Sequence, residues 1–141
     1  MQVSAACHCG NISFDFTWPD AAGPLMGRAC GCSFCQKHGG IWTSSPEGRL
    51  SARIADGDAL RRYSFGTKTA DFYVCSDCGA VPFVVSEIEE RKYAVINVNT
   101  FEGDGARDLE TMPTNFDGED VDGRLGRRER NWIRNVEVVI A

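Results

Sequence analysis

The alternation of hydrophobic and polar residues along the chain predicts β-strands far more clearly than helices. Residues 11–16 alternate strictly, and residues 93–99 form the best strand candidate in the sequence. Further strands are expected over five segments, the last two more weakly indicated: 71–74, 81–86, 132–140, 41–43 and 61–65. Helical periodicity is poor, and it predicts only one short helix, around residues 105–111. Fifteen glycines and five prolines divide the chain into short pieces. We therefore expect a mainly β fold with short turns.

Length and composition indicate an ordinary globular protein. The 141 residues contain no internal repeat, low-complexity tract or linker, so we expect a single domain over residues 1–141. No apolar run approaches the roughly 18 residues that span a bilayer, which argues against a membrane protein. The formal net charge of −5 argues against nucleic-acid binding. The first residues resemble no secretory signal, so we expect a cytoplasmic protein with reduced cysteines.

The informative feature of the composition is its seven cysteines, which fall into three clusters. In a reducing compartment, clustered cysteines indicate metal binding or catalysis rather than disulfides, and an odd count also argues against a closed disulfide framework. The clusters are Cys7 with Cys9, then Cys30 with Cys32 and Cys35, and then Cys75 with Cys78.

Two of these clusters together predict a closed zinc site. Cys75 and Cys78, followed by Gly79, have the spacing of a zinc knuckle. Cys7 and Cys9 are two residues apart, so in an extended chain they face the same side and can supply two more ligands. Four thiolates are typical of a structural zinc site. Spacing alone leaves other pairings of the clusters open.

The remaining cluster, Cys30, Cys32 and Cys35, has the pattern of a catalytic zinc with a free fourth position. Two alternatives stay open: His8 or His38 closes a second inert site, or the thiols bind no metal. Three thiolates weaken the Lewis acidity of zinc, which disfavours hydrolysis, and a soft site favours a sulfur ligand. The sequence therefore predicts two zinc ions and a small thiol, presented as thiolate to an electrophile such as an aldehyde.

At this point the motifs resemble a known family, the glutathione-dependent formaldehyde-activating enzymes, also called the centromere protein V family. The resemblance covers most of residues 5–101 and is carried by the combined spacing of the three clusters. It includes Trp18-Pro19 and the segment from Ile96 to Thr100. The family usually has a histidine where this chain has Gly31, and an arginine in the segment that here contains Phe72. Both departures concern the identity of the substrate rather than the zinc sites.

The resemblance implies a β-tent fold of folded-over antiparallel sheets around a structural zinc. It implies that Cys7, Cys9, Cys75 and Cys78 hold that zinc, and that Cys30, Cys32 and Cys35 hold the catalytic one. The implied activity is that of a carbon–sulfur lyase resembling S-(hydroxymethyl)glutathione synthase, which joins formaldehyde to glutathione. The alternative is a non-catalytic zinc module that binds a protein partner, or a carrier of a small thiol. The sequence carries no signal for an oligomeric state.

Some residues outside the clusters have competing interpretations. His38 is a candidate proton shuttle, but the favoured interpretation is an exposed loop histidine. The acidic loop at 117–123 lacks the ligand spacing of a calcium site. We expect the basic residues after it to pair with this loop or to be solvated, and binding of glutathione carboxylates is the less favoured alternative. These residues are Arg124, Arg127, Arg128, Arg130 and Arg134. Trp18, Trp42 and Trp132 are expected in the core or at its rim, and Trp42 follows the central cluster.

Overall fold

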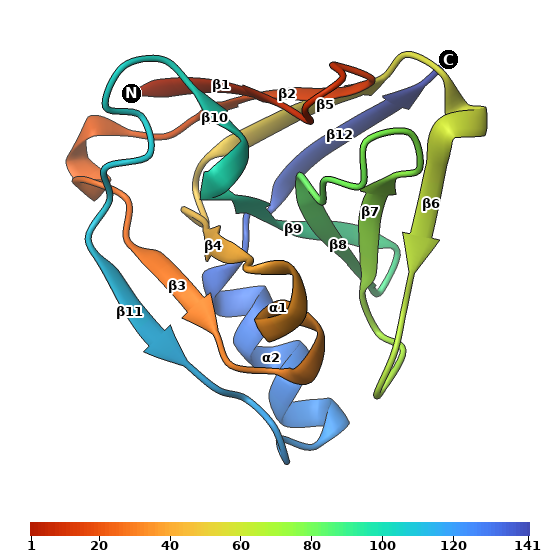
Figure 1. Ribbon diagram of the computed structural model, residues 1–141. Coiled ribbons are helices and arrows are strands. Elements are labelled where there is room, and N and C mark those ends of the chain that lie inside the picture. Colours follow the sequence, from red (N-terminus) through yellow and green to blue (C-terminus); the bar gives the residue numbers. More distant parts are fainter.

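The fold consists of two β-sheets that enclose the main hydrophobic core. The computed structural model describes residues 1–141. The five-stranded sheet crosses the top of the view in Figure 1 and has the order β10 (Phe101–Glu102), β1 (Gln2–Ala6), β2 (Ile12–Thr17), β5 (Arg49–Ile54) and β12 (Asn135–Ile140). The seven-stranded sheet has the order β11 (Thr111–Thr114), β3 (Gly27–Cys30), β4 (Ile41–Thr43), β9 (Arg91–Asn97), β8 (Phe83–Ile88), β7 (Asp71–Cys75) and β6 (Leu60–Tyr63). The expected mainly β fold is confirmed.

Most neighbouring strands are antiparallel, and two pairs at the sheet edges are parallel. β12 runs parallel to β5, and β11 runs parallel to β3. Parallel partners need a long connection rather than a tight hairpin. Each of these pairs therefore joins a late segment of the chain to an early one, which the local sequence pattern does not reveal.

The main core follows from the two-residue period of the strands. On β2, Ile12, Phe14 and Phe16 are buried, and the residues between them are half-buried. They meet β8 of the other sheet, where the ring of Phe83 lies edge-on to Phe14 with centroids 6.2 Å apart. This alternation is the pattern that identified residues 11–16 in the sequence, because one face of the strand is buried and the other is not.

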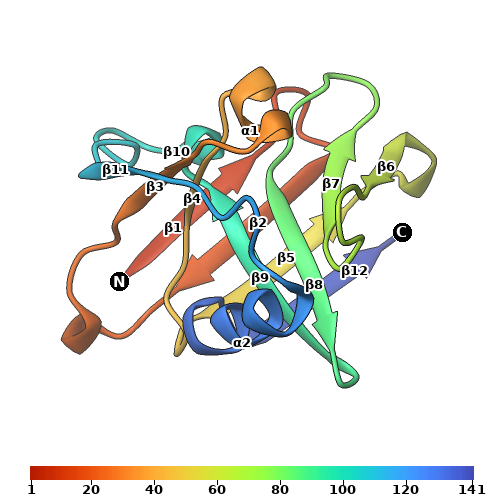
Figure 2. The same cartoon turned by 90° about the horizontal axis from the view of Figure 1, so that it is seen from below.

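The centre of the seven-stranded sheet is buried on both faces. On β9, Ala94 and Ile96 belong to the core between the sheets, whereas Tyr93 and Val95 belong to a second cluster with Trp132. α2 (Val121–Asn131) contacts β8 on that second side (Figure 2). A strand buried on both faces is apolar almost throughout, which explains why residues 93–99 are the clearest strand in the sequence.

The helices are few and short, and neither α-helix was predicted. α1 (Ser33–His38) lies within the central cysteine cluster, and α2 begins after Asp120, whose carboxylate accepts a 2.7 Å hydrogen bond from the N–H of Gly123. Arg128 is the only buried residue of α2. The helix therefore lacks the apolar stripe that identifies an amphipathic helix in a sequence. Three 3₁₀ turns complete the fold: η1 (Asp20–Ala22), η2 (Gly57–Ala59) and η3 (Val98–Thr100).

The prediction of a helix around residues 105–111 is wrong. Gly103 and Gly105 have positive φ angles of 108° and 72°, which place them in turns rather than in a helix. The chain then becomes extended at Thr111 and forms β11, which pairs with β3 from Gly27 onward. The predicted last strand is confirmed, but it begins at Asn135, and before it Ile133 makes only an isolated bridge to Ala94 of β9.

Five strands were not predicted, namely β1, β3, β5, β10 and β11. β1 and β3 consist largely of small or polar residues, which give little hydrophobic contrast.

Neither helix combines the length and the hydrophobicity that a membrane span requires.

Candidate metal centres and the adjoining cavity

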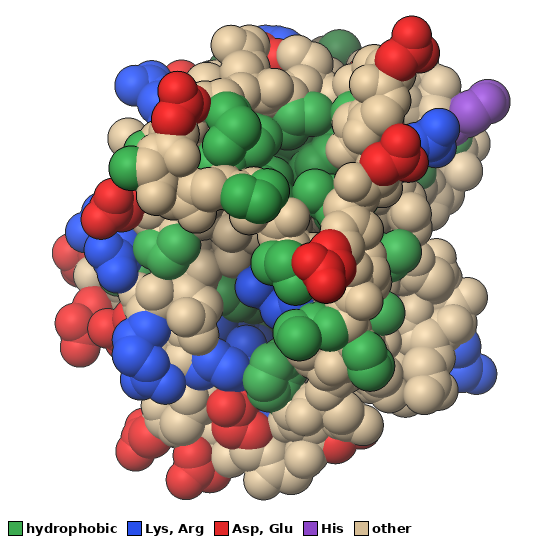
Figure 3. Space-filling model, turned by 90° about the vertical axis from the view of Figure 1, so that its left-hand side faces the viewer, with side chains coloured by type: hydrophobic (Ala, Val, Ile, Leu, Met, Phe, Trp, Pro, Cys, Tyr) green, Lys and Arg blue, Asp and Glu red, His purple; other side chains and the backbone are tan.

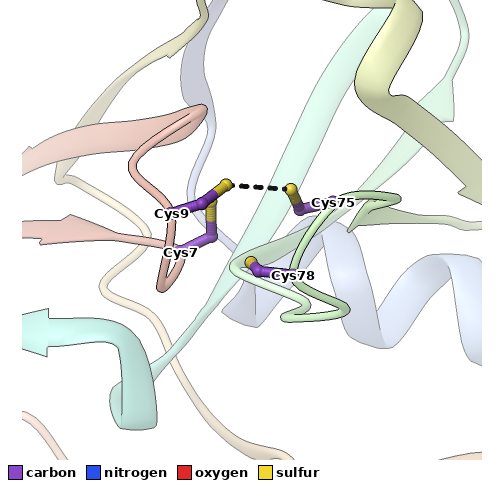
Figure 4. Close-up of side chains that lie close together, drawn as sticks. All are labelled: Cys7, Cys9, Cys75 and Cys78. Carbon is purple, nitrogen blue, oxygen red and sulfur yellow. Dashed lines mark hydrogen bonds between the residues drawn. The ribbon is translucent and has the colours of Figure 1, made fainter.

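The first and third cysteine clusters come together, as the spacing predicted. Cys7 follows β1 and Cys9 lies in the loop to β2, whereas Cys75 ends β7 and Cys78 lies in the turn to β8. Figure 4 shows the two loops facing each other, with all four thiols pointing toward a common centre. Two hairpin turns from different sheets are thereby brought into contact.

The spacing of these four sulfurs fits a tetrahedral metal ion. The Sγ atoms of Cys7 and Cys9 are 3.8 Å apart, and those of Cys9 and Cys75 are 3.5 Å apart. All four sulfurs lie within 4.8 Å of one another. Sulfurs bound to zinc at about 2.3 Å in a tetrahedron are separated by about 3.8 Å. This cluster could therefore hold one metal ion.

The surroundings of this cluster favour a mixture of thiol and thiolate. Burial raises the pKa of Cys7 to about 12, although the Ile12 N–H donates to its sulfur at 3.2 Å. For Cys78, burial also acts to raise the pKa, but backbone N–H donors, including that of Ala80, and the neighbouring thiols outweigh it and lower the pKa to about 6. Cys78 is thus ionised at neutral pH, and a cation in the cluster would stabilise the other thiolates.

The central cluster is organised by the start of α1. Cys30 ends β3, and the Sγ of Cys32 caps the helix by accepting a 3.4 Å hydrogen bond from the N–H of Cys35. The three sulfurs lie within 4.8 Å of one another, so this cluster could also hold a metal ion. One tight turn of backbone therefore places three potential ligands on the same side.

Neither histidine joins the central cluster. His8 and His38 lie instead beside a different surface hollow, and the three-cysteine group contains no fourth ligand. His38 is half-buried rather than exposed, because its ring packs 4.5 Å from that of Phe34. Burial also lowers the pKa of His38. The favoured interpretation of His38 as an exposed loop residue is therefore wrong.

Gly31 sits in a tight contact between the central cluster and β11. Its N–H donates to the carbonyl of Thr114 at 2.7 Å, and a Cβ at Gly31 would lie 3.3 Å from the same oxygen. A larger residue there would press against the end of β11. This contact explains why a residue without a side chain suits the position between Cys30 and Cys32.

Trp42 connects the central cluster to the sheet. Its indole N–H donates to the Sγ of Cys35 at 3.3 Å, and both side chains are buried. Cys35 in turn hydrogen-bonds to Cys30, which lowers the pKa of Cys30 to about 6 and raises that of Cys35. Trp42 is therefore a core tryptophan that also contacts a candidate metal ligand.

The three cysteines of the central cluster line a cavity of about 120 Å³. Its apolar walls include Trp42, Phe72 and Phe65, and the last two stack with centroids 5.5 Å apart. Phe65 belongs to the segment between β6 and β7, which the sequence did not associate with the cysteines. A cavity with apolar walls and a few convergent polar groups is typical of a small-molecule site.

Four arginines line the same cavity: Arg28, Arg124, Arg127 and Arg128. On the face drawn in Figure 3, basic side chains gather in a hollow that is edged by hydrophobic side chains. Sequence reasoning missed Arg28, although it lies two residues before Cys30 on β3, a spacing that places both on one face of the strand.

The expected pairing of the basic stretch with the acidic loop is confirmed for two of its members. Arg127 makes a forked contact with Glu119 at 3.0–3.2 Å, and Arg124 lies 3.8 Å from the same carboxylate. Arg128 differs from both, because it contacts no carboxylate.

The chain is similar to known proteins over most of its length. The chain is similar to a Rhodobacter sphaeroides protein of known crystal structure, with 27% sequence identity and a TM-score of 0.55, over 78% of this chain and 97% of that one. A search of curated proteins gave no match. The family model described as glutathione-dependent formaldehyde-activating enzyme matches residues 2–115, which include all seven cysteines and end before α2. The chain therefore belongs to the glutathione-dependent formaldehyde-activating enzyme family.

Proposed function

We propose that this protein is a zinc-dependent carbon–sulfur lyase that forms or cleaves the adduct of a small thiol and an aldehyde, with glutathione and formaldehyde as the first candidates. The observation that carries the proposal is the open three-cysteine cluster, which lacks a fourth protein ligand and lines a cavity. A purely structural site would close its coordination with a fourth ligand. Family membership supports the same chemistry.

The two clusters have different roles in this proposal. Cys7, Cys9, Cys75 and Cys78 bind a structural zinc that joins the two hairpin turns. Cys30, Cys32 and Cys35 would hold the second zinc, which would supply Lewis acidity that favours the thiolate form of an incoming thiol. The fold is then a β-tent built as one domain over residues 1–141.

The reaction forms one carbon–sulfur bond and moves one proton. The thiol sulfur adds to the carbonyl carbon, and the proton lost by the thiol ends on the former carbonyl oxygen, without oxidation or reduction. Asp117 is the one carboxylate among the cavity-lining residues, so it is the candidate to carry this proton. The walls formed by Trp42, Phe65 and Phe72 hold the reactants together, so that positioning supplies the rate.

Exchange NMR with ¹³C-formaldehyde and glutathione tests the activity. The zinc-loaded protein should accelerate interconversion of free and adduct forms above the spontaneous rate. Cys32→Ser should return the rate to the spontaneous value, whereas Ser33→Ala, an exposed change in the same turn, should not. Thiol binding without acceleration would instead favour a small-thiol carrier, and absence of both would favour a non-catalytic zinc module.

Zinc-edge X-ray absorption tests the open position directly. Protein freed of small thiols should show an average of about 3.5 sulfurs per zinc, and added glutathione should raise this to about 4. A count of about 4 before any thiol is added would contradict the proposal, as would a count that no small thiol raises.

A further inference from the structure

Arg128 is a buried cation without a counter-charge. It is 6% exposed, and all the hydrogen bonds that it donates leave from Nη1, toward the carbonyl and hydroxyl of Thr69 and the hydroxyl of Ser86, at 2.8–3.2 Å. Its guanidinium lies over the ring of Trp132 at 4.9 Å. Its Nε is buried and has no hydrogen-bond partner. The Nε–Nη2 edge, which binds carboxylates in a forked geometry, is therefore unused.

The charge of Arg128 is retained at neutral pH. Burial, together with the nearby charges of Arg127 and Arg124, lowers its pKa to about 10. Glu119, the acidic residue whose charge acts on Arg128, is already engaged with those two arginines. A buried charge without a partner destabilises a protein unless a ligand or an ion compensates it. An anion from outside the chain would compensate the charge of Arg128.

A second arginine without a carboxylate partner faces the same cavity. Arg28 donates to the hydroxyl of Ser44 at 2.9 Å and makes no ion pair. Arg28, Arg128 and the three cysteines of the central cluster are all lining residues of this cavity. Asp117 is the only acidic residue among all the residues that line this cavity.

We propose that Arg128 and Arg28 form an anion subsite that binds a carboxylate of the substrate, so that the protein selects carboxylate-bearing thiols over neutral thiols of the same size. The inference rests on the proposed function and names its substrate class. Arg128 and Arg28 are specificity-determining residues, and α2, which lies beyond the residues matched by the family model, supplies the first of them. Thr69 and Ser86 position the guanidinium by holding Nη1.

Binding of a matched pair of thiols tests the subsite without relying on turnover. Calorimetry on zinc-loaded protein compares 3-mercaptopropionate with its neutral amide, 3-mercaptopropionamide. The acid should bind roughly ten- to hundredfold more tightly, as expected for charge-assisted hydrogen bonds. Arg128→Gln should abolish the preference, and Arg128→Lys should restore only part of it because lysine lacks the forked geometry. Arg130→Gln changes an exposed arginine on the same helix outside the cavity and should retain the preference.

Two further measurements keep the test decisive if Arg128→Gln fails to fold. Arg28→Gln should reduce the preference on its own. With the wild-type protein, propionate should compete with 3-mercaptopropionate and should leave binding of the amide almost unchanged. Equal binding of acid and amide by the wild-type protein would overturn the inference. The role of the two arginines would then be to balance the negative charge of the thiolate cluster.

The same experiments separate this inference from the proposed function. If 2-mercaptoethanol raises the zinc sulfur count but acid and amide bind equally, the thiol site stands and the anion subsite is wrong. If propionate binds in an Arg128-dependent manner but no thiol raises the sulfur count, the anion subsite stands and the proposed lyase function is wrong. The ligand of the subsite is then a carboxylate that carries no thiol.

Discussion

The indole N–H of Trp42 donates a hydrogen bond to the sulfur of Cys35 across 3.3 Å, inside the second hydrophobic cluster. The bond joins β4 to α1, two elements that frame the central cysteine cluster. A donor to a metal-ligating sulfur orients that ligand and tunes its basicity.

Replacing Trp42 by phenylalanine should weaken metal binding at the central cluster while keeping most of the aromatic packing. The loss of the N–H donor should lower zinc affinity there by about ten- to a hundredfold, as for other residues that orient metal ligands. Competition with a chromophoric chelator measures this affinity. Trp18→Phe is the matched control, since its indole N–H donates to the carbonyl of Gly23 and its ring packs against the main core rather than the second cluster. Equal zinc release from both variants would contradict the assigned role.

The two cysteine clusters should differ in what their loss does to the fold. The four-cysteine site joins turns from both sheets, so Cys78→Ser should give insoluble or unfolded protein. Cys32→Ser changes a site confined to the end of β3 and the start of α1, so the protein should fold and lose only the zinc that a chelator removes first. Circular dichroism and metal analysis of both variants check this. Similar unfolding of both would show that the clusters do not differ in this way.

Two glycine-to-alanine changes should have opposite effects on stability. A Cβ at Gly48 would lie 2.5 Å from the ring of Phe16 and 2.8 Å from the carbonyl of Thr17, so Gly48→Ala should destabilise the fold by about 1–3 kcal/mol. Within α2, a Cβ at Gly126 meets only the mobile end of Arg130 at 3.3 Å. Gly126→Ala should therefore stabilise by up to about 1 kcal/mol. Urea unfolding of the two variants beside the wild type gives both values.

The N-terminus of α2 should depend on one carboxylate. Asp120 caps the helix by accepting from the N–H of Gly123, so Asp120→Ala should lower the free energy of unfolding by about 1 kcal/mol. Asp120→Asn keeps an acceptor in the same position and should recover most of the loss. Thermal unfolding at neutral pH distinguishes the two, and an equal loss in both variants would show that the cap contributes little.

Local patterns in the sequence were enough to predict several strands and the cysteine clusters. Strands β2, β4, β8 and β9 were predicted because strict alternation or a continuous apolar run indicates how many of their faces are buried. The spacing favoured the grouping of Cys7 and Cys9 with Cys75 and Cys78 but left other pairings open, and the structure brings these four thiols together. The clustering of Cys30, Cys32 and Cys35 needed only six residues of chain.

The tertiary structure alone decided what lies around the central cluster. Helix α2 has no apolar stripe because its buried position is the arginine Arg128, so periodicity gave no sign of it. β11 pairs in parallel with β3, which comes much earlier in the chain, and such pairing leaves no local signature. The cavity is lined by residues that lie far apart in the sequence, among them Arg28 and Arg128. Arg28 and Arg128 come close together only because both sheets fold and bury their apolar surfaces. A short stretch of sequence cannot show this total gain in burial.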